Sequence, residues 1–245
     1  MTTQPPIPTR ECVSDELKIE ASSQYSLLRM ILIDSLSSGR IVDMPVDEGA
    51  VLTGRNGAGK TSMLQLLPLF YGESPNRIVT AEAGRQSFIG YYLPRDTSYI
   101  VFEYEHQGDK RQVAIYADRN GEKAIYRFIR HGFEPRQFAL PDGELVRTQN
   151  LVKHLKMQGF QCCEQQIESL SEYRAIVQAI PATTRDRQRQ RYLRELTSDY
   201  SFTPPNRPLP STFSSRPVDQ PAASAAVSRR NSSARFSGDR ERRGG

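Results

Sequence analysis

The pattern of apolar and polar residues begins near residue 25 and predicts two antiparallel strands first. Residues 27–33 are almost continuously apolar, which is typical of a strand buried on both faces. Ser37-Ser38-Gly39 is a turn signal, and residues 40–44 follow it as the return strand. The short apolar run 50–52 predicts another strand, which leads directly into a glycine-rich loop and an apolar helix. Two short strands that are followed by a strand, a loop and a helix predict an α/β fold.

From residue 98 the period of the pattern changes to two, which predicts an antiparallel meander. Its three strands are expected at 99–104, 112–116 and 124–129. Gly108-Asp109 and Asn120-Gly121 separate them, and Asn-Gly is among the strongest hairpin signals. The aromatic residues of these strands are interpreted as core or cross-strand packing, with a base-stacking surface as the functional alternative.

The remaining segments carry helical spacing. The helix after the glycine-rich loop should be short, because Pro68 lacks the N–H for the carbonyl of Leu64, and we expect it to close at residues 67–70. Residues 72–76 are then predicted to be a loop. Further helices are predicted between an N-cap at Thr148 and a C-cap at Gly159, over 172–180, and from Thr184 to Leu196 as an arginine-rich helix.

Composition divides the chain into three parts. Residues 1–24 are expected to be a disordered leader, 25–200 the folded body, and 201–245 a disordered basic tail rich in Ser, Pro and Arg. The range 206–245 carries eight Arg against three acidic residues, so it accounts for the whole net charge of +5. A nucleic-acid surface on the body therefore cannot be inferred from net charge. The abrupt change in composition is also what a shifted reading frame would produce.

Cysteine usage and hydropathy indicate a cytoplasmic protein. Cys12, Cys162 and Cys163 do not form a disulfide framework, which favours a reducing compartment. Cys162 and Cys163 together with His154 lack the spacing of a metal site and are interpreted as buried packing residues. The chain contains no run of 18 apolar residues, so no membrane span is predicted.

The glycine-rich loop matches G-x-x-x-x-G-K-[ST], the phosphate-binding P-loop. Its glycines allow positive φ and close approach of the backbone to a ligand. Backbone N–H groups from the loop would converge on the β-phosphate of ATP. Lys60, the candidate catalytic residue, would lie between the β- and γ-phosphates, and the Thr61 hydroxyl would bind Mg²⁺. The candidate nucleotide-binding residues are Gly54, Arg55, Asn56, Gly57, Ala58, Gly59, Lys60, Thr61 and Ser62.

The Gly-x-Asn-Gly-Ala-Gly-Lys-Thr form of this loop, between two strands and a meander, resembles the N-terminal half of an SMC/RecF/RecN-type ATPase head. It is especially similar to a group of large SMC-like bacterial ATP-binding proteins. The likeness is carried by 27–35, 52–77 and 88–104, and it extends over about 25–200. The resemblance implies an ABC-type P-loop NTPase head, ATP and Mg²⁺ held between two heads, and a role in DNA handling. It also places Arg77 in an arginine-bearing loop that senses phosphate or DNA.

Several family features are missing from the sequence. No apolar strand ends in Asp-Glu, and residues 169–172 lack the glycines of the signature motif. Gln86, Gln149 and Gln161 all remain candidates for the glutamine of the Q-loop. The resemblance therefore implies a truncated lobe that needs a C-terminal lobe or a second head to hydrolyse ATP. The alternatives are a self-contained P-loop kinase or GTPase, whose guanine motif is absent, and a non-enzymatic interaction fragment.

Overall fold

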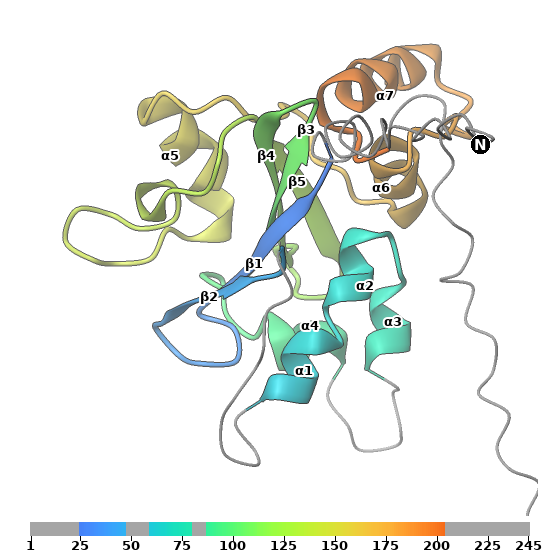
Figure 1. Cartoon of the computed structure of the whole chain (residues 1–245). Helices are drawn as coiled ribbons and strands as arrows, with labels where there is room; N and C mark the ends of the chain where they lie inside the picture. The colour runs from blue at the N-terminus through green and yellow to red at the C-terminus, as the bar shows by residue number, and fades with distance from the viewer. Residues whose placement is uncertain (1–24, 48–58, 80–86, 204–245) are drawn as a thin grey trace, which may run out of the picture. The chain divides into compact units, whose positions relative to one another are not determined.

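A five-stranded antiparallel sheet forms the centre of the computed structural model, which describes residues 25–47, 59–79 and 87–203 (Figure 1). The strands follow one another in the order β2-β1-β3-β4-β5. Their bounds are Leu27–Ile33 (β1), Ile41–Pro45 (β2), Tyr99–His106 (β3), Asp109–Ala117 (β4) and Ala124–Ile129 (β5). All five strands were predicted in type and approximate place, and the mixed α/β composition is confirmed. The predicted strand at 50–52 lies outside the described residues.

The hairpin between β3 and β4 shows how the turn residues set the register. Gln107 and Gly108 have φ of 53° and 84°, and they are the two loop residues between the paired His106 and Asp109. Two consecutive positive φ angles suit the right-handed twist of a two-residue hairpin. The sequence had placed this turn one residue later, at Gly108-Asp109.

Each face of the sheet carries its own apolar cluster, because side chains alternate along every strand. On one face, Met30, Phe102 and Val113 pack against residues of four helices: α2 (Leu67–Phe70), α4 (Phe88–Tyr92), α6 (Leu170–Val177) and α7 (Arg187–Tyr200). On the other face, Ile31, Val101 and Ala114 pack against Leu151 and Leu155 of α5 (Leu151–Met157). Figure 1 shows the same arrangement, with α5 on one side of the strands and the other helices on the opposite side.

The helices are mostly short. The first four are α1 (Lys60–Leu64), α2 (Leu67–Phe70), α3 (Pro75–Ile78) and α4 (Phe88–Tyr92), and the last three are α5 (Leu151–Met157), α6 (Leu170–Val177) and α7 (Arg187–Tyr200).

The predicted loop at 72–76 is wrong in its last part, because Pro75 begins α3, where its missing N–H has no cost. Thr148 is also not a helix N-cap: it begins a 3₁₀ turn, Thr148–Asn150, ahead of α5. Helix α6 ends three residues before Ile180, since Ala179 adopts φ of 52°.

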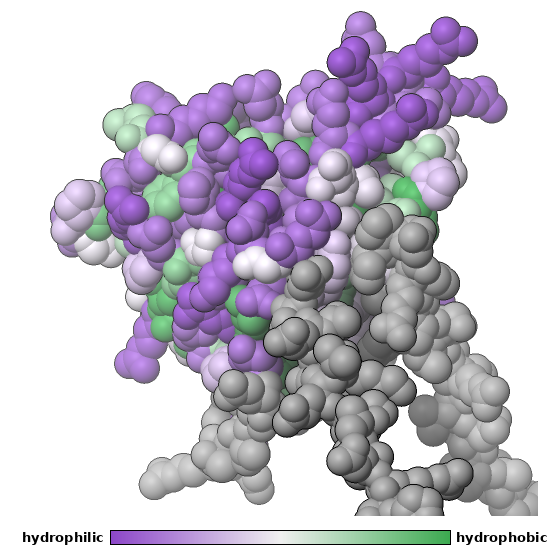
Figure 2. Space-filling view, turned by 45° about the horizontal axis from the view of Figure 1, so that its top comes forward, coloured by the Kyte–Doolittle hydropathy of each residue, from purple (hydrophilic) through white to green (hydrophobic). Residues whose placement is uncertain are grey.

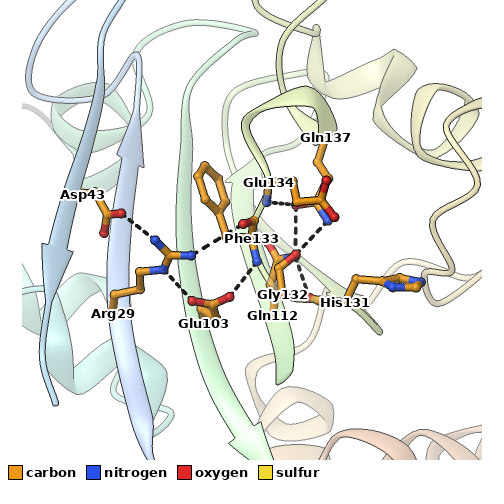
Figure 3. Close-up of polar contacts among 9 residues, drawn as sticks. All are labelled: Arg29, Asp43, Glu103, Gln112, His131, Gly132, Phe133, Glu134 and Gln137. Atoms are coloured by element: carbon orange, nitrogen blue, oxygen red, sulfur yellow. Dashed lines mark hydrogen bonds and ion pairs between the residues drawn. The ribbon is translucent and has the colours of Figure 1, made fainter. Parts of the chain in front are cut away.

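A buried polar network holds residues 131–137 against the α5 face of the sheet (Figure 3). The carboxylate of Glu103 on β3 is only 2% exposed; it pairs with Arg29 on β1 and accepts a hydrogen bond from the N–H of Phe133 at 2.7 Å. Gln112 on β4 donates to the carbonyl of His131 at 2.7 Å. Neighbouring strands thus supply polar partners for this segment, which includes a 3₁₀ turn at Pro135–Gln137.

The surface in Figure 2 is mainly hydrophilic, and its hydrophobic residues lie in small separate patches. The described chain ends with Ser201, Phe202 and Thr203, which pack on the body: the Phe202 N–H donates to the Val177 carbonyl at 2.8 Å. Within the described ranges, no helix has the length and apolar character needed to cross a bilayer.

Candidate phosphate-binding site

The second half of the glycine-rich loop lies within the described residues, and the first half does not. Gly54, Arg55, Asn56, Gly57 and Ala58 lie outside the described residues. Gly59 has φ of 81° and precedes α1, which begins at Lys60. The Met63 N–H donates to the Gly59 carbonyl at 2.9 Å, so the first helical turn closes directly behind this glycine. A left-handed residue at this point is what the final glycine of a P-loop provides.

The turn after β1 lies against Gly59. A Cβ built on Gly59 would lie 3.8 Å from Leu36 Cδ1, so these two segments are close neighbours. The turn is fixed by Asp34, which has φ of 46° and is 3% exposed. Its carboxylate accepts from the Gly39 N–H at 2.6 Å and from the Thr97 hydroxyl, and Arg95 Nη1 lies 3.4 Å from it. The corner next to the loop is therefore held by a buried, fully engaged carboxylate.

Helix α4 holds α1 from the other side. The Tyr92 hydroxyl donates to the Ser62 carbonyl at 3.0 Å, and the Ser35 hydroxyl donates to the Tyr92 carbonyl at 2.5 Å. Burial raises the pKa of Tyr92, so the phenol is kept in the protonated form that donates. These contacts tie β1, α4 and α1 together, and Thr61 on α1 is an exposed residue.

The interruption between α1 and α2 anchors the helical segment in the core. The sequence predicts a helix that closes at residues 67–70 because of Pro68, but α1 ends earlier, at Leu64. Pro68 itself lies in the first turn of α2, where no N–H donor is required. The change of direction at Gln65-Leu66 places Leu66, Leu69 and Phe70 in the apolar cluster, each at most 1% exposed.

Helix α6 completes the anchoring by supplying donors to the carbonyls at the end of α2. The Tyr173 hydroxyl donates to the Phe70 carbonyl at 2.8 Å, and Arg174 Nε donates to the Gly72 carbonyl at 2.6 Å. Gln178 donates to the Tyr71 carbonyl at 2.7 Å. The last carbonyls of a helix have no partner within the helix, so these side chains stabilise its end.

Arg77 lies on α3, which contacts α4. Its Nη1 is 3.6 Å from Glu73 Oε1, in the i, i+4 relation, and its side chain is 64% exposed. Such a surface pair contributes little to stability. The side chain is thus held near α3 and remains accessible to an anion.

Two of the three candidate glutamines lie in the described chain. Gln149 lines a cavity on the α5 side of the sheet. Gln161 lies beside β5, where its carbonyl accepts from the Arg130 N–H at 2.9 Å. Gln86 lies outside the described residues.

The cysteines are packing residues in the described structure. Cys163 is 4% exposed and belongs to the apolar cluster of one face, and Cys162 packs partly against the other. Burial raises the pKa of both thiols, which disfavours the thiolate that a metal requires. Among the described residues, no three His, Cys, Asp or Glu side chains are grouped as metal ligands.

The residues that position α1 could not be identified from the sequence. Ser35, Tyr91 and Tyr92 act through contacts between distant segments, and only the aromatic run at 88–92 could have indicated a packed helix there. The Tyr91 hydroxyl lies 3.4 Å from Ser62 Oγ, and its ring packs edge-on against Tyr92.

A comparison with protein-family models identifies the chain's family. A model described as "Protein of unknown function (DUF3584)" matches residues 31–213, which is 183 of the 245 residues. The comparisons with curated proteins and with solved structures gave no match. The matched range includes the glycine-rich loop, the whole meander and the three last helices. Because the match extends over most of the chain, the chain belongs to the DUF3584 family.

Proposed function

We propose that this chain binds ATP with Mg²⁺ through residues 54–62, as the N-terminal lobe of an SMC-like ATPase head. The observation that carries the proposal is the conformation of Gly59, whose φ of 81° directly precedes the first helical residue, Lys60. In a P-loop this geometry turns the chain so that backbone N–H groups face the phosphates at the start of the helix.

The roles of the side chains follow from their chemistry. The Lys60 ammonium would contact the β- and γ-phosphate oxygens, and the Thr61 hydroxyl would join the phosphates in ligating Mg²⁺. Lys60 is half-buried and Thr61 is exposed. Nucleotide binding would therefore remove more water from Thr61 than from Lys60. Arg77, on α3, would respond to the added negative charge of nucleotide or DNA.

The sheet favours an SMC-like head over a P-loop kinase. Every strand pairing in the described chain is antiparallel. A kinase of the P-loop class is built from βαβ units, which require parallel strands joined by crossover helices. The antiparallel sheet agrees with the meander that the resemblance to SMC-like heads implies.

Hydrolysis would need further residues. The sequence contains no apolar strand ending in Asp-Glu and no Leu-Ser-Gly-Gly-Gln motif. Phosphoryl transfer depends on a metal, a water and charged groups that are positioned together. We therefore expect this chain to bind the nucleotide and to require a C-terminal lobe or a second head for turnover. A role in DNA repair, chromosome or plasmid maintenance, or defence follows only from the resemblance.

Calorimetric titration with ATP and Mg²⁺ tests the binding site. Lys60→Ala should reduce the affinity below detection, because it removes the cation that contacts the phosphates. Lys153→Ala changes the same residue type at an exposed position of α5 and serves as the matched control, with unchanged affinity. Equal affinity of wild type and Lys60→Ala would refute the proposed site.

A further inference from the structure

Arg127 is a buried cation on the face of the sheet that α5 covers. It lies on β5 and is 4% exposed. Its Nη1 donates to the carbonyls of Cys163 at 2.7 Å and Glu164 at 3.0 Å. Its Nη2 makes one long contact of 3.4 Å with the Tyr116 hydroxyl, and its Nε is buried with no hydrogen-bond partner among the described residues.

This pattern leaves one edge of the guanidinium unsatisfied. Nε and Nη2 form the fork that binds carboxylates and phosphates through two parallel hydrogen bonds. The bonds to backbone carbonyls occupy the other end of the group. A buried donor without a partner destabilises the folded state, so such a donor in a folded protein requires an explanation.

The charge of Arg127 is also uncompensated. Arginine stays protonated in proteins, and a buried charge is normally paired with an opposite charge. In the part of the chain that the structure describes, no carboxylate lies within ion-pairing distance of this guanidinium, although eleven other ion pairs are present there. Backbone carbonyls offer partial charges only, so the site retains a net positive charge.

Arg127 lines a cavity of about 400 Å³ between β4, β5 and the start of α5. This volume lies within the range of small-molecule sites. The other polar walls are Arg119, Thr148, Gln149 and Gln166, whose side chains can donate hydrogen bonds to an anion. Asp118 is the one acidic residue of the lining, and its Oδ1 is used by the N–H groups of Glu122 at 2.7 Å and Lys123 at 3.0 Å.

We infer that this cavity binds a small oxyanion, a phosphate or carboxylate group, through the Nε and Nη2 edge of Arg127. One ligand oxygen would replace the Tyr116 hydroxyl at Nη2, and the second would satisfy Nε. Arg119 and the amide of Gln149 would complete the shell, whereas the Gln166 amide already donates to Glu168 at 2.6 Å. The site shares no residue with the glycine-rich loop, so it is independent of the proposed ATP site.

The test uses the full chain carrying Lys60→Ala, which removes the competing phosphate site. Inorganic phosphate and succinate are titrated separately, at constant ionic strength maintained with NaCl, and binding is followed through the arginine Nε–H signals in ¹H–¹⁵N NMR spectra. The signal of Arg127 is assigned by its loss in Arg127→Gln. We expect a saturable shift of this signal with one or both anions, and the stronger response identifies the oxyanion class.

Two substitutions examine the residues of the site. Arg127→Gln should weaken binding by about tenfold or more in calorimetry, because the paired hydrogen bonds of the fork are lost. Arg130→Gln, on an arginine with a side chain 47% exposed just after β5, is the matched control and should bind as before. If Arg127→Gln does not fold, Gln149→Leu replaces it, with a several-fold loss expected. Two results would overturn the inference. One is an Arg127 Nε–H signal that stays unchanged with both anions. The other is an anion affinity of the cavity variant (Arg127→Gln or Gln149→Leu) that equals the affinity of the control, Arg130→Gln.

Discussion

At the scale of single residues, the candidate site depends on a few groups with unusual backbone or protonation requirements. Gly59 with φ of 81° and Asp34 with φ of 46° are two left-handed residues close to the start of α1. The glycine adopts this conformation at no steric cost, whereas Asp34 is held there by hydrogen bonds to Gly39 and Thr97. The geometry at the start of α1 is therefore supported from the β1 corner.

Gly59→Ala should lower ATP affinity by strain on the backbone alone. The new Cβ would lie 3.8 Å from Leu36, which is an ordinary contact, but φ of 81° remains unfavourable for alanine by about 1 kcal/mol. Gly159→Ala is the matched control, because Gly159 has the same φ of 81° and no neighbouring atoms within 4 Å. Both variants should lose similar stability in denaturant unfolding, and only Gly59→Ala should bind ATP more weakly. Equal affinities would show that the conformation of Gly59 does not matter for binding.

The tyrosines of the core predict a loss of stability at alkaline pH. Tyr126 stacks on Tyr173 with ring centroids 4.3 Å apart, and burial raises the pKa of Tyr126 to about 12. In the unfolded chain a tyrosine loses its proton near pH 10. The contribution of the protonated Tyr126 to stability is thus complete below pH 10 and is lost as the pH rises to 12. Over this range the free energy of unfolding falls by up to about 1.4 kcal/mol per pH unit for this one group.

Tyr126→Phe isolates this contribution. The variant should show a shallower decline of the free energy of unfolding between pH 10 and 12, because one fewer proton is released on unfolding. Between pH 7 and 9 its stability should differ from that of the wild type by a constant amount. Urea unfolding at a series of pH values measures both quantities, and identical slopes above pH 10 would contradict the assigned shift.

At the scale of elements, strands were easier to predict from the sequence than helices. The residues of β3, β4 and β5 alternate or run continuously apolar between clear turn signals, so local sequence defines them. The limits of α1 and α2 depend on where Leu66 and Phe70 reach the core, which is a tertiary effect. For the same reason the sequence analysis placed Pro75 and Asn76 of α3 in a loop.

The polar network of Figure 3 could not be predicted, because its members come from segments far apart in the sequence. Arg29, Glu103 and Phe133 lie on β1, β3 and the segment after β5. The pKa of Arg29 is raised by its hydrogen bond to Glu103, which outweighs the effect of burial. The same limitation applies to Arg127, whose burial and missing partner appear only in the folded chain.

Glu103→Gln should destabilise the attachment of residues 131–137. The substitution removes the charge that pairs with Arg29 and keeps an oxygen that can accept from the Phe133 N–H. Because Arg29 is 30% exposed, we expect the free energy of unfolding to fall by about 1 to 3 kcal/mol, which is less than for a fully buried ion pair. Asp43→Asn removes the second carboxylate that pairs with Arg29. Because the Asp43 side chain is 43% exposed, this substitution should lower the free energy of unfolding by less than about 1 kcal/mol. Urea unfolding compares the two; a larger effect of Asp43→Asn would reverse the assigned roles.

At the scale of the whole molecule, an antiparallel sheet with helices packed on each face supports the start of α1. The resemblance to SMC-like heads supplied the functional proposal, and the family match extends across the same part of the chain. The mixed α/β composition and the antiparallel meander were predicted from the sequence. Residues 54–58, to which we assign phosphate binding in the proposed function, lie outside the described residues.

Incubating an excess of the full chain with radiolabelled ATP and Mg²⁺ tests the central claim most directly, because retained nucleotide and released phosphate are measured in the same sample. We predict that the wild type retains ATP, that Lys60→Ala does not, and that no labelled phosphate is released unless a C-terminal lobe is supplied. Retention no greater than that of Lys60→Ala, or phosphate release by the chain alone, would contradict the account.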